Sequence, residues 1–269
     1  MEGSLMLSYE FMQRAILVGL MLAIIIPMIG IVMVNRRTSM IGDALSHTAL
    51  SGVALGLIIG INPVFTSIII CIVASFAIEI IRKKFKSFGD MATAIIMSLG
   101  IGLAGILSDF TPGGTSFESF LFGSITSVTR EDVIIVSVIF ILVLFFSLYL
   151  YYPLLYNSIS PLMANLSGIN SKLISSIFTF LTAITVAIST KTVGALMISS
   201  LMVLPVASGL LISKSYKETF IKSIIIAIIY MMAGISASFY LGIKPGGAIV
   251  VIAVFGMIIS IIIQKILKR

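Results

Sequence analysis

One aspartate and one histidine share a predicted helical face in an otherwise apolar part of the chain. Asp43 precedes His47, the only histidine, by four positions. On an α-helix, residues at i and i+4 lie on one face, with Cβ atoms about 5–6 Å apart. A carboxylate and an imidazole placed in this way can bind one divalent cation together. The sequence therefore predicts a metal site at these two residues.

A purely structural role for this pair is the alternative interpretation. The two side chains could hydrogen-bond to each other, or Asp43 could cap the helix that starts after Gly42. Ionisable groups inside membrane spans are costly, at least ~2.5–3.5 kcal/mol at mid-span, and are functional by default. Two ligands are too few for capture, whereas two copies of the chain would supply four. Four N/O ligands suit Zn²⁺ and are accepted by Mn²⁺ and Fe²⁺, so a metal site here predicts a homodimer.

The composition predicts that most side chains face lipid. Hydrophobic residues make up 59% of the 269 residues and charged residues only 10%, against about 25% charged in a soluble domain. The mean hydropathy is +1.23. The net charge of +7 comes from short cation clusters between apolar runs, which indicates membrane topology rather than nucleic-acid binding. A single cysteine, Cys71, excludes an internal disulfide.

Apolar runs of the length that a membrane requires recur along the whole chain. A span needs about 20 such residues, and glycines or a proline in two of the runs leave eight spans possible as well as nine. We predict an all-α, polytopic transmembrane helical bundle in which residues 1–269 form a single domain. The nine predicted spans are about 13–34, 41–60, 64–81, 91–108, 132–152, 173–189, 193–213, 221–241 and 247–264.

The clustered cations predict the orientation of the chain in the membrane. Nine alternating spans place all the clusters on one side, which the positive-inside rule assigns to the cytoplasm. The N-terminus is then outside and the C-terminus is cytoplasmic. The cations on the cytoplasmic side are Arg36, Arg37, the cluster at 82–86, Lys172, Lys214, Lys217, Lys222, Lys265, Lys268 and Arg269.

Several stretches resemble the manganese/zinc/iron ABC-transporter permease family. Residues 41–47 (Ile-Gly-Asp-Ala-Leu-Ser-His), followed by 51–54, carry the most specific part of the resemblance. Residues 120–125, 193–207 and 239–249 are similar to later motifs of the same family, so that the likeness covers nearly the whole chain.

The resemblance implies a function and a set of partners. It implies the membrane-spanning subunit of an ATP-binding-cassette importer for Zn²⁺, Mn²⁺ or Fe²⁺ in the cell membrane, in which Asp43 and His47 match the gating metal ligands. Two such subunits would pair with a cytoplasmic ATPase homodimer, and an extracytoplasmic protein would deliver the metal. The chain contains no G-x-x-x-x-G-K-[ST] motif, so we expect a transport subunit that is not itself an enzyme and holds no resident cofactor.

Two further groups of residues follow from the resemblance and the topology. The family's ATPase-coupling segment corresponds to about 157–172 and includes Leu166, Gly168, Ile169 and Lys172. Relatives usually carry acidic residues at the start of this segment, where this chain has Ser158, Ser160 and Pro161. Among the scattered external cations, Arg130, Lys191 and Lys244 are candidates for docking the metal-delivering protein.

The sequence alone also allows two other classes of function to be considered. A secondary transporter or channel, independent of ATP, could also use one acidic–imidazole pair, although such carriers usually have internal repeats and none is evident. An intramembrane metalloenzyme is disfavoured because the chain lacks an H-E-x-x-H motif and has only one histidine.

Overall fold

The structure, a computed structural model, describes residues 8–85, 89–111 and 114–267, and all regular structure in these ranges is helical. Nine of the described helices are long and apolar enough to cross a membrane, as predicted. They are α2 Glu10–Asn35, α3 Met40–Ile59, α4 Pro63–Lys84, α5 Gly89–Ser108, α7 Arg130–Tyr149, α10 Ser171–Thr192, α11 Ala195–Ile212, α12 Tyr216–Leu241 and α13 Pro245–Leu267. Short helices α6 Gly114–Phe122, α8 Tyr151–Ile159 and α9 Pro161–Leu166 connect them.

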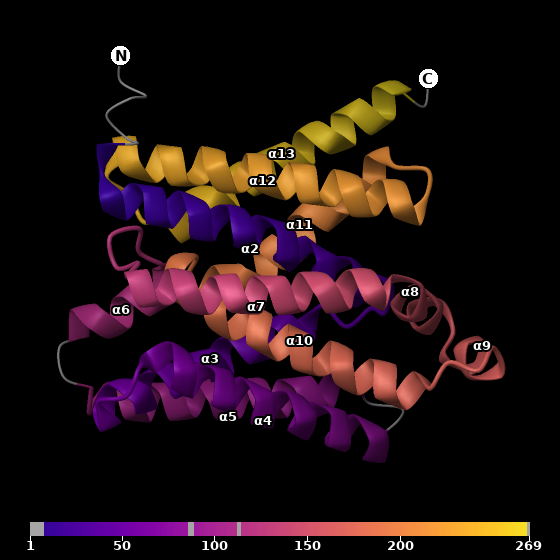
Figure 1. The fold of residues 1–269 in the computed structure, drawn as a ribbon, viewed down its shortest axis with the longest axis horizontal. Helices are drawn as coiled ribbons and strands as arrows, with labels where there is room; N and C mark the ends of the chain where they lie inside the picture. Colours follow the sequence, from indigo (N-terminus) through magenta and orange to yellow (C-terminus); the bar gives the residue numbers. More distant parts are fainter. Residues whose placement is uncertain (1–7, 86–88, 112–113, 268–269) are drawn as a thin grey trace.

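The long helices lie roughly side by side in three groups (Figure 1). Helices α3, α4 and α5 pack together on one side, and α11, α12 and α13 pack together on the other. Helices α2 and α10 lie between the two groups; α10 contacts both of them, whereas α2 packs against α11, α12 and α10. The most buried spans are α2, α3 and α10, whereas α5, α7 and α13 expose most of their surface. The helix that carries the predicted metal ligands therefore belongs to the interior of the bundle.

The backbone contacts of α3 depend on glycine. A Cβ atom added to Gly52 would lie 2.6 Å from the Cα of Ser67 on α4. A Cβ atom added to Gly100 of α5 would lie 2.9 Å from the backbone nitrogen of Thr48. Small residues allow membrane helices to approach this closely. Helix α3 is therefore in close backbone contact with α4 on one side and with α5 on the other.

Proline and hydroxyl side chains are accommodated without breaking the spans. Helix α11 continues through Pro205, and α2 continues through Pro27. Helix α5 is also continuous. The two runs whose glycines or proline left eight spans possible are therefore both unbroken helices, α5 and α11. In the buried α10, four hydroxyls donate to carbonyls three or four residues earlier, which satisfies them without water; they belong to Thr182, Thr185, Ser189 and Thr190.

Two connections differ from the prediction. The span expected at 132–152 ends at Tyr149, and α8 begins at Tyr151. The break puts Pro153 in the first turn of a new helix, where its missing N–H costs no hydrogen bond. Between the fourth and fifth predicted spans, where no span was expected, Gly114–Phe122 forms the short helix α6.

The cation clusters gather at one end of the bundle, which we call the basic end. It contains the C-terminal ends of α2 and α4, the starts of α10 and α12, and helices α8 and α9 (Figure 1). Lys86, Lys268 and Arg269 lie outside the described residues. The shared end agrees with the topology that the cations predict, while the assignment of this end to the cytoplasm stays a prediction.

We predict that Gly30→Ala destabilises the bundle. The added Cβ would lie 2.1 Å from the carbonyl oxygen of Met202 on α11, so α2 and α11 must separate. Overpacking of this kind costs about 1–3 kcal/mol. Thermal unfolding of the purified chain in detergent should show a lower Tm. Gly102→Ala is the control, because nothing lies within 4 Å of its added Cβ; equal Tm values for the two variants would contradict the prediction.

Candidate metal-ion site

A tight turn between α2 and α3 sets the position of Asp43. Arg37 has a positive φ of 54°, and the backbone N–H of Thr38 donates to the carbonyl of Met33 at 2.9 Å. The chain reverses there, and α3 starts at Met40, so that Asp43 falls in its first turn. A carboxylate at this position is stabilised by the positive end of the helix dipole.

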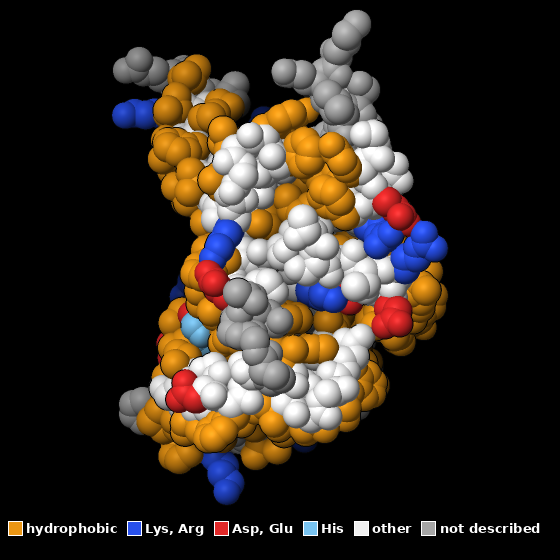
Figure 2. All heavy atoms as spheres, turned by 90° about the vertical axis from the view of Figure 1, so that its left-hand side faces the viewer, with side chains coloured by type: hydrophobic (Ala, Val, Ile, Leu, Met, Phe, Trp, Pro, Cys, Tyr) orange, Lys and Arg blue, Asp and Glu red, His pale blue; other side chains and the backbone are white. Residues whose placement is uncertain are grey.

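Asp43 and His47 lie on one face of α3, as the spacing predicts. The Nε2 atom of His47 is 3.9 Å from the Oδ1 atom of Asp43. The side chains are 33% and 20% exposed for Asp43 and His47, respectively. The pair is thus close enough to share one cation, and both side chains reach the surface of this single chain. Figure 2 shows the single histidine, in pale blue, at the edge of the molecule.

Ser46 points away from this face. Its hydroxyl is buried and donates to the carbonyl oxygen of Asp43 at 2.8 Å. The hydroxyl is therefore committed to the helix backbone and does not extend the ligand set. Residues i and i+1 do not face each other on a helix. Ser46 and His47 therefore cannot act together as the nucleophile and general base of an enzyme.

A shallow groove beside Asp43 brings in residues that the sequence analysis missed. It has a volume of about 270 Å³ and lies between the start of α3 and α11. Ser199 and Ser200 of α11 line it together with Asp43. The sequence signal was a pair of adjacent hydroxyls within an apolar span, but only the packing of α11 against α3 brings them to the carboxylate.

No larger metal site exists within the described part of one chain. These residues contain no group of three or more His, Cys, Asp or Glu side chains that could hold a metal ion. One copy therefore presents one carboxylate and one imidazole, half of a four-ligand set.

The three cations expected to dock a partner lie at the end opposite the basic end, and each forms an ion pair within the chain. Arg130 pairs with Glu10 at 2.5 Å, and Lys244 pairs with Glu118. Both pairs are largely exposed. A docking role for these cations remains a prediction, because a partner's acidic group would have to compete with the acid already present.

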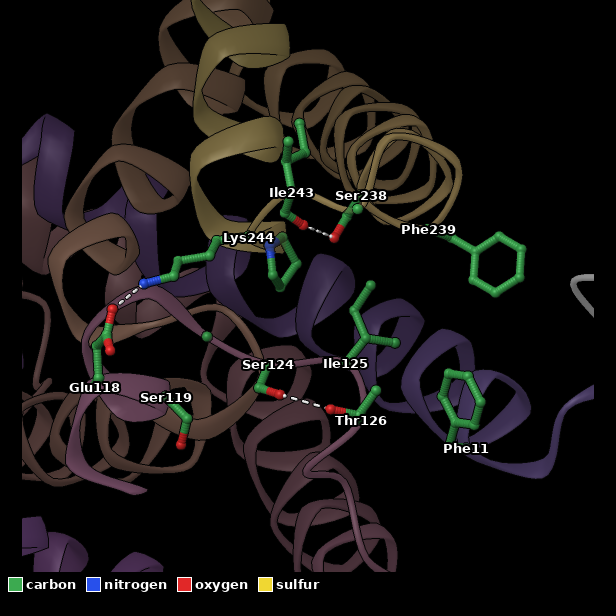
Figure 3. A pocket seen from close by; sticks show the side chains of 13 residues that line it. Phe11, Glu118, Ser119, Ser124, Ile125, Thr126, Ser238, Phe239, Ile243 and Lys244 are labelled. Carbon is green, nitrogen blue, oxygen red and sulfur yellow. Dashed lines mark hydrogen bonds and ion pairs between the residues drawn. The ribbon is translucent and has the colours of Figure 1, made fainter. Parts of the chain in front are cut away.

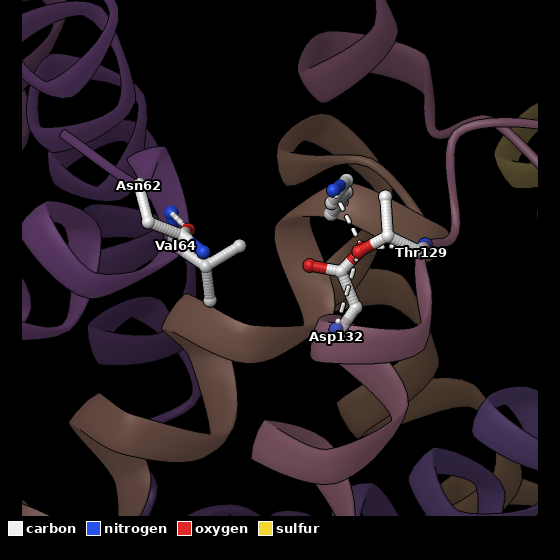
Figure 4. A network of polar contacts seen from close by, with 5 residues as sticks. Asn62, Val64, Thr129 and Asp132 are labelled. Carbon is white, nitrogen blue, oxygen red and sulfur yellow. Dashed lines mark hydrogen bonds and ion pairs between the residues drawn. The ribbon is translucent and has the colours of Figure 1, made fainter. Parts of the chain in front are cut away.

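Lys191 is different from the other two because it turns inward. Its Nζ lies 2.6 Å from Oδ2 of Asp132, and the two side chains are only 18% and 7% exposed. The same oxygen accepts hydrogen bonds from the backbone N–H and the hydroxyl of Thr129, both at 2.7 Å (Figure 4). This network ties the start of α7 to the end of α10.

Three of the motifs that carry the family resemblance meet beside this network. A Cβ atom on Gly194, which has a φ of +96°, would lie 2.5 Å from the nitrogen of Gly123. A Cβ atom on Gly246 would lie 2.1 Å from the carbonyl oxygen of Val193. The glycines of these motifs therefore serve close backbone packing of the α6–α7 connection, α11 and α13.

A pocket of about 440 Å³ opens next to this junction (Figure 3). Lys244 and Glu118 reach toward each other on one side of it, and Phe11 and Phe239 lie on another. The hydroxyls of Ser124 and Thr126 are 3.2 Å apart between them.

The segment expected to couple to an ATPase, about 157–172, covers the end of α8, all of α9 and the first residues of α10 at the basic end. Leu166 is 75% exposed, and Ile159, Leu162 and Met163 are exposed as well. Gly168 has a φ of +80°, which ends the segment in a tight turn, while Ile169 packs against the core and Lys172 is exposed. Asn157 holds the segment to α10 by donating to the hydroxyl of Ser175 at 3.2 Å.

Comparison with known proteins identifies relatives over nearly the full length. The model of the ABC 3 transport family matches residues 8–264. A probable metal transport system membrane protein of Treponema pallidum is 30% identical over 95% of this chain and 97% of its own length. The high-affinity zinc uptake system membrane protein ZnuB of Haemophilus influenzae is 29% identical over 94% and 97%. The manganese transport system membrane protein MntC of Listeria monocytogenes is 26% identical over 94% and 90%.

A solved structure has the same fold. A chain of PsaBC from Streptococcus pneumoniae, determined in complex with Fab, superimposes with a TM-score of 0.85 at 25% identity. The match covers 94% of this chain and 91% of that one.

We predict that Asp132→Asn destabilises the chain strongly, because it leaves the largely buried ammonium group of Lys191 without a carboxylate. Removing one partner of a buried ion pair costs about 3–5 kcal/mol, measured as a lower Tm in detergent. Glu118→Gln is the matched control, since an exposed pair contributes about 0–1 kcal/mol. Equal losses in both variants would show that burial of the Lys191 pair has no special effect.

Proposed function

The chain belongs to the ABC 3 transport family, and we propose that two copies of it bind a divalent transition-metal ion in transit through Asp43 and His47. The observation that carries this proposal is the pair itself: a carboxylate and an imidazole 3.9 Å apart on one partly exposed helical face.

Membership of the family sets the general function. The chain is the multi-pass, membrane-spanning permease subunit of a metal-ion ABC importer. It is a transport component, and a partner ATPase subunit hydrolyses the ATP. An extracytoplasmic binding protein is the other partner that an importer of this family implies. The ATP-independent carrier left open by the sequence is therefore disfavoured.

The incomplete ligand set argues for a shared site between two permease copies. Asp43 and His47 are partly exposed in the single chain although two thirds of α3 is buried. A second copy facing this edge would bring the set to two carboxylates and two imidazoles. Such a set holds Zn²⁺ in tetrahedral geometry. A site divided between two subunits also opens when they move apart, which a transport site requires.

The transported ion is Zn²⁺, Mn²⁺ or Fe²⁺. Nitrogen and oxygen ligands accept all three, and geometry rather than ligand type separates them. The relatives include one named for zinc uptake and one named for manganese transport. Ser199 and Ser200 border Asp43 in the groove. Their hydroxyl oxygens would be further ligands for the ion as it moves away from the carboxylate.

The exposed apolar residues of α8 and α9 are the proposed contact with the ATPase. Ile159, Leu162, Met163 and Leu166 form this coupling surface, and Gly168, Ile169 and Lys172 connect it to α10. Because Asn157 links the segment to α10 and α10 contacts α2, α3 and α4, motion of the ATPases can reach α3. The two permeases would then rock between outward-open and inward-open states.

The proposed docking face for the metal-delivering protein is the end opposite the basic end, where Arg130, Lys191 and Lys244 lie.

We predict that Asp43→Ala and His47→Ala each abolish most metal uptake by the reconstituted complex. Loss of a group that only supports a metal ligand already costs about 10–100-fold, so loss of a ligand should lower uptake at least about tenfold. The measurement is uptake of radioactive Zn²⁺ or Mn²⁺ into liposomes containing permease, ATPase and binding protein.

Ser46→Ala is the control, because this neighbouring hydroxyl faces the helix backbone rather than the groove. Assembly of each variant is checked by co-purification with the ATPase. Normal uptake by both the Asp43→Ala and His47→Ala complexes would show that the pair is structural.

We also predict that Leu166→Asn weakens binding of the ATPase subunit. Leu166 is 75% exposed at the basic end, and a polar side chain there removes apolar area from the coupling surface. Leu241→Asn is the control, since Leu241 is 69% exposed at the opposite end. Co-purification should fall only for Leu166→Asn; a loss confined to Leu241→Asn would reverse the proposed orientation.

A further inference from the structure

A second pocket lies at the basic end, between the last turns of α4 and the first turns of α10. Its volume is about 670 Å³, and Pro161 at the start of α9 is among the residues that line it. Four charged side chains also line it, and they are Arg36, Glu79, Arg82 and Lys83. The pocket contains neither Asp43 nor His47.

The charges around this pocket do not cancel. The carboxylate of Glu79 lies 2.8 Å from Nζ of Lys83, so these two groups neutralise each other. Arg36 and Arg82 form no ion pair with any residue that the structure describes. Two guanidinium charges therefore face the same cavity without a counter-ion from the described part of the chain.

Arg36 is held in a position that leaves hydrogen-bond donors free. Its Nη2 donates to the hydroxyl of Ser175 at 3.0 Å, and its guanidinium carbon lies 5.2 Å from the centre of the Phe178 ring. Burial lowers the pKa of Arg36 from its ordinary value, and the charge of Arg82 lowers it further, while the nearby carboxylate of Glu79 opposes this shift only in part. Because a guanidinium stays protonated in proteins and has five N–H donors, the arrangement favours an anion that accepts several hydrogen bonds.

We propose that this pocket binds the phosphate of an anionic phospholipid headgroup between Arg36 and Arg82. Guanidinium groups bind phosphate oxygens through paired, charge-assisted hydrogen bonds, and basic pockets between membrane helices are known to take anionic headgroups. The pocket lies at the ends of two membrane-spanning helices, α4 and α10, where lipid headgroups lie, so we assign the phosphate to a phospholipid and test free phosphate as the alternative.

This site goes beyond metal transport and does not depend on it. A lipid bound here would contact the end of α4, α10 and the start of α9 together. It would thus sit against the coupling segment without being part of the ion path.

Native mass spectrometry of the full chain in detergent tests the proposal. The chain is incubated with dioleoylphosphatidylglycerol or with dioleoylphosphatidylcholine, and retained lipid is counted. We expect preferential retention of phosphatidylglycerol, lowered roughly fivefold by Arg82→Gln and by Arg36→Gln. Lys84→Gln is the matched control, because it removes one cation from the same helical turn outside the pocket, and it should leave retention unchanged.

Several outcomes would overturn the proposal. Equal retention of the two lipids, or an equal loss in Lys84→Gln, would mean that the charge of the surface as a whole attracts lipid. Displacement of the lipid by millimolar inorganic phosphate would identify a site for a soluble anion. Weaker binding of the ATPase subunit to Arg82→Gln, with lipid retention unchanged, would identify a protein contact. If Arg36→Gln is not monodisperse on gel filtration, that variant is misfolded and is set aside. Lipid retention by Arg82→Gln alone then supports or overturns the proposal.

Discussion

The close approach of helix backbones around α3 is the constraint on which the rest of the structure depends. Lipid removes most of the hydrophobic drive for helices to associate, so packing must come from close van der Waals contact at small residues. Gly52 permits contact of α3 with α4, and Gly100 permits contact with α5. These contacts bury most of α3 and leave the edge with Asp43 and His47 accessible. A rigid, deeply packed helix can therefore present two polar ligands at a fixed separation.

In the proposed metal site, this rigidity means that no loop has to order itself around the ion. The described residues of the same chain offer no third His, Cys, Asp or Glu ligand beside the pair, so further ligands must come from outside the chain. What remains adjustable is the distance to groups outside the chain, which subunit motion changes. Binding and release can then follow from one movement, while the geometry within each half of the site stays constant. The buried Lys191–Asp132 pair has a comparable role at the opposite end, because it fixes α7 against α10 where three glycine motifs meet.

The features that could be predicted from the sequence are those with a local signal. Span positions follow from runs of apolar residues, and the Asp43–His47 face follows from a spacing of four on a helix. Helix α6 was missed because its polar surroundings hide the pattern of Phe117, Phe120 and Leu121, which pack toward the core. Ser199 near Asp43, and Arg36 near Arg82, could not be found in this way, since each pair joins helices far apart in the sequence. In the same way, nothing in the sequence distinguishes Lys191, whose side chain is 18% exposed, from Lys244, whose side chain is 52% exposed.

The distribution of charge links the topology to the two ends of the bundle. At the end opposite the basic end, the described cations all have a carboxylate partner: Arg14 and Arg130 share Glu10, Lys191 has Asp132, and Lys244 has Glu118. At the basic end, Arg36, Arg37, Arg82, Lys84 and Lys172 have none among the described residues. Unpaired cations at one membrane face repel one another, and an anionic leaflet relieves that repulsion. The asymmetry from which we predict the orientation of the chain by the positive-inside rule is therefore also the reason to propose the basic end as the face that binds negatively charged lipid.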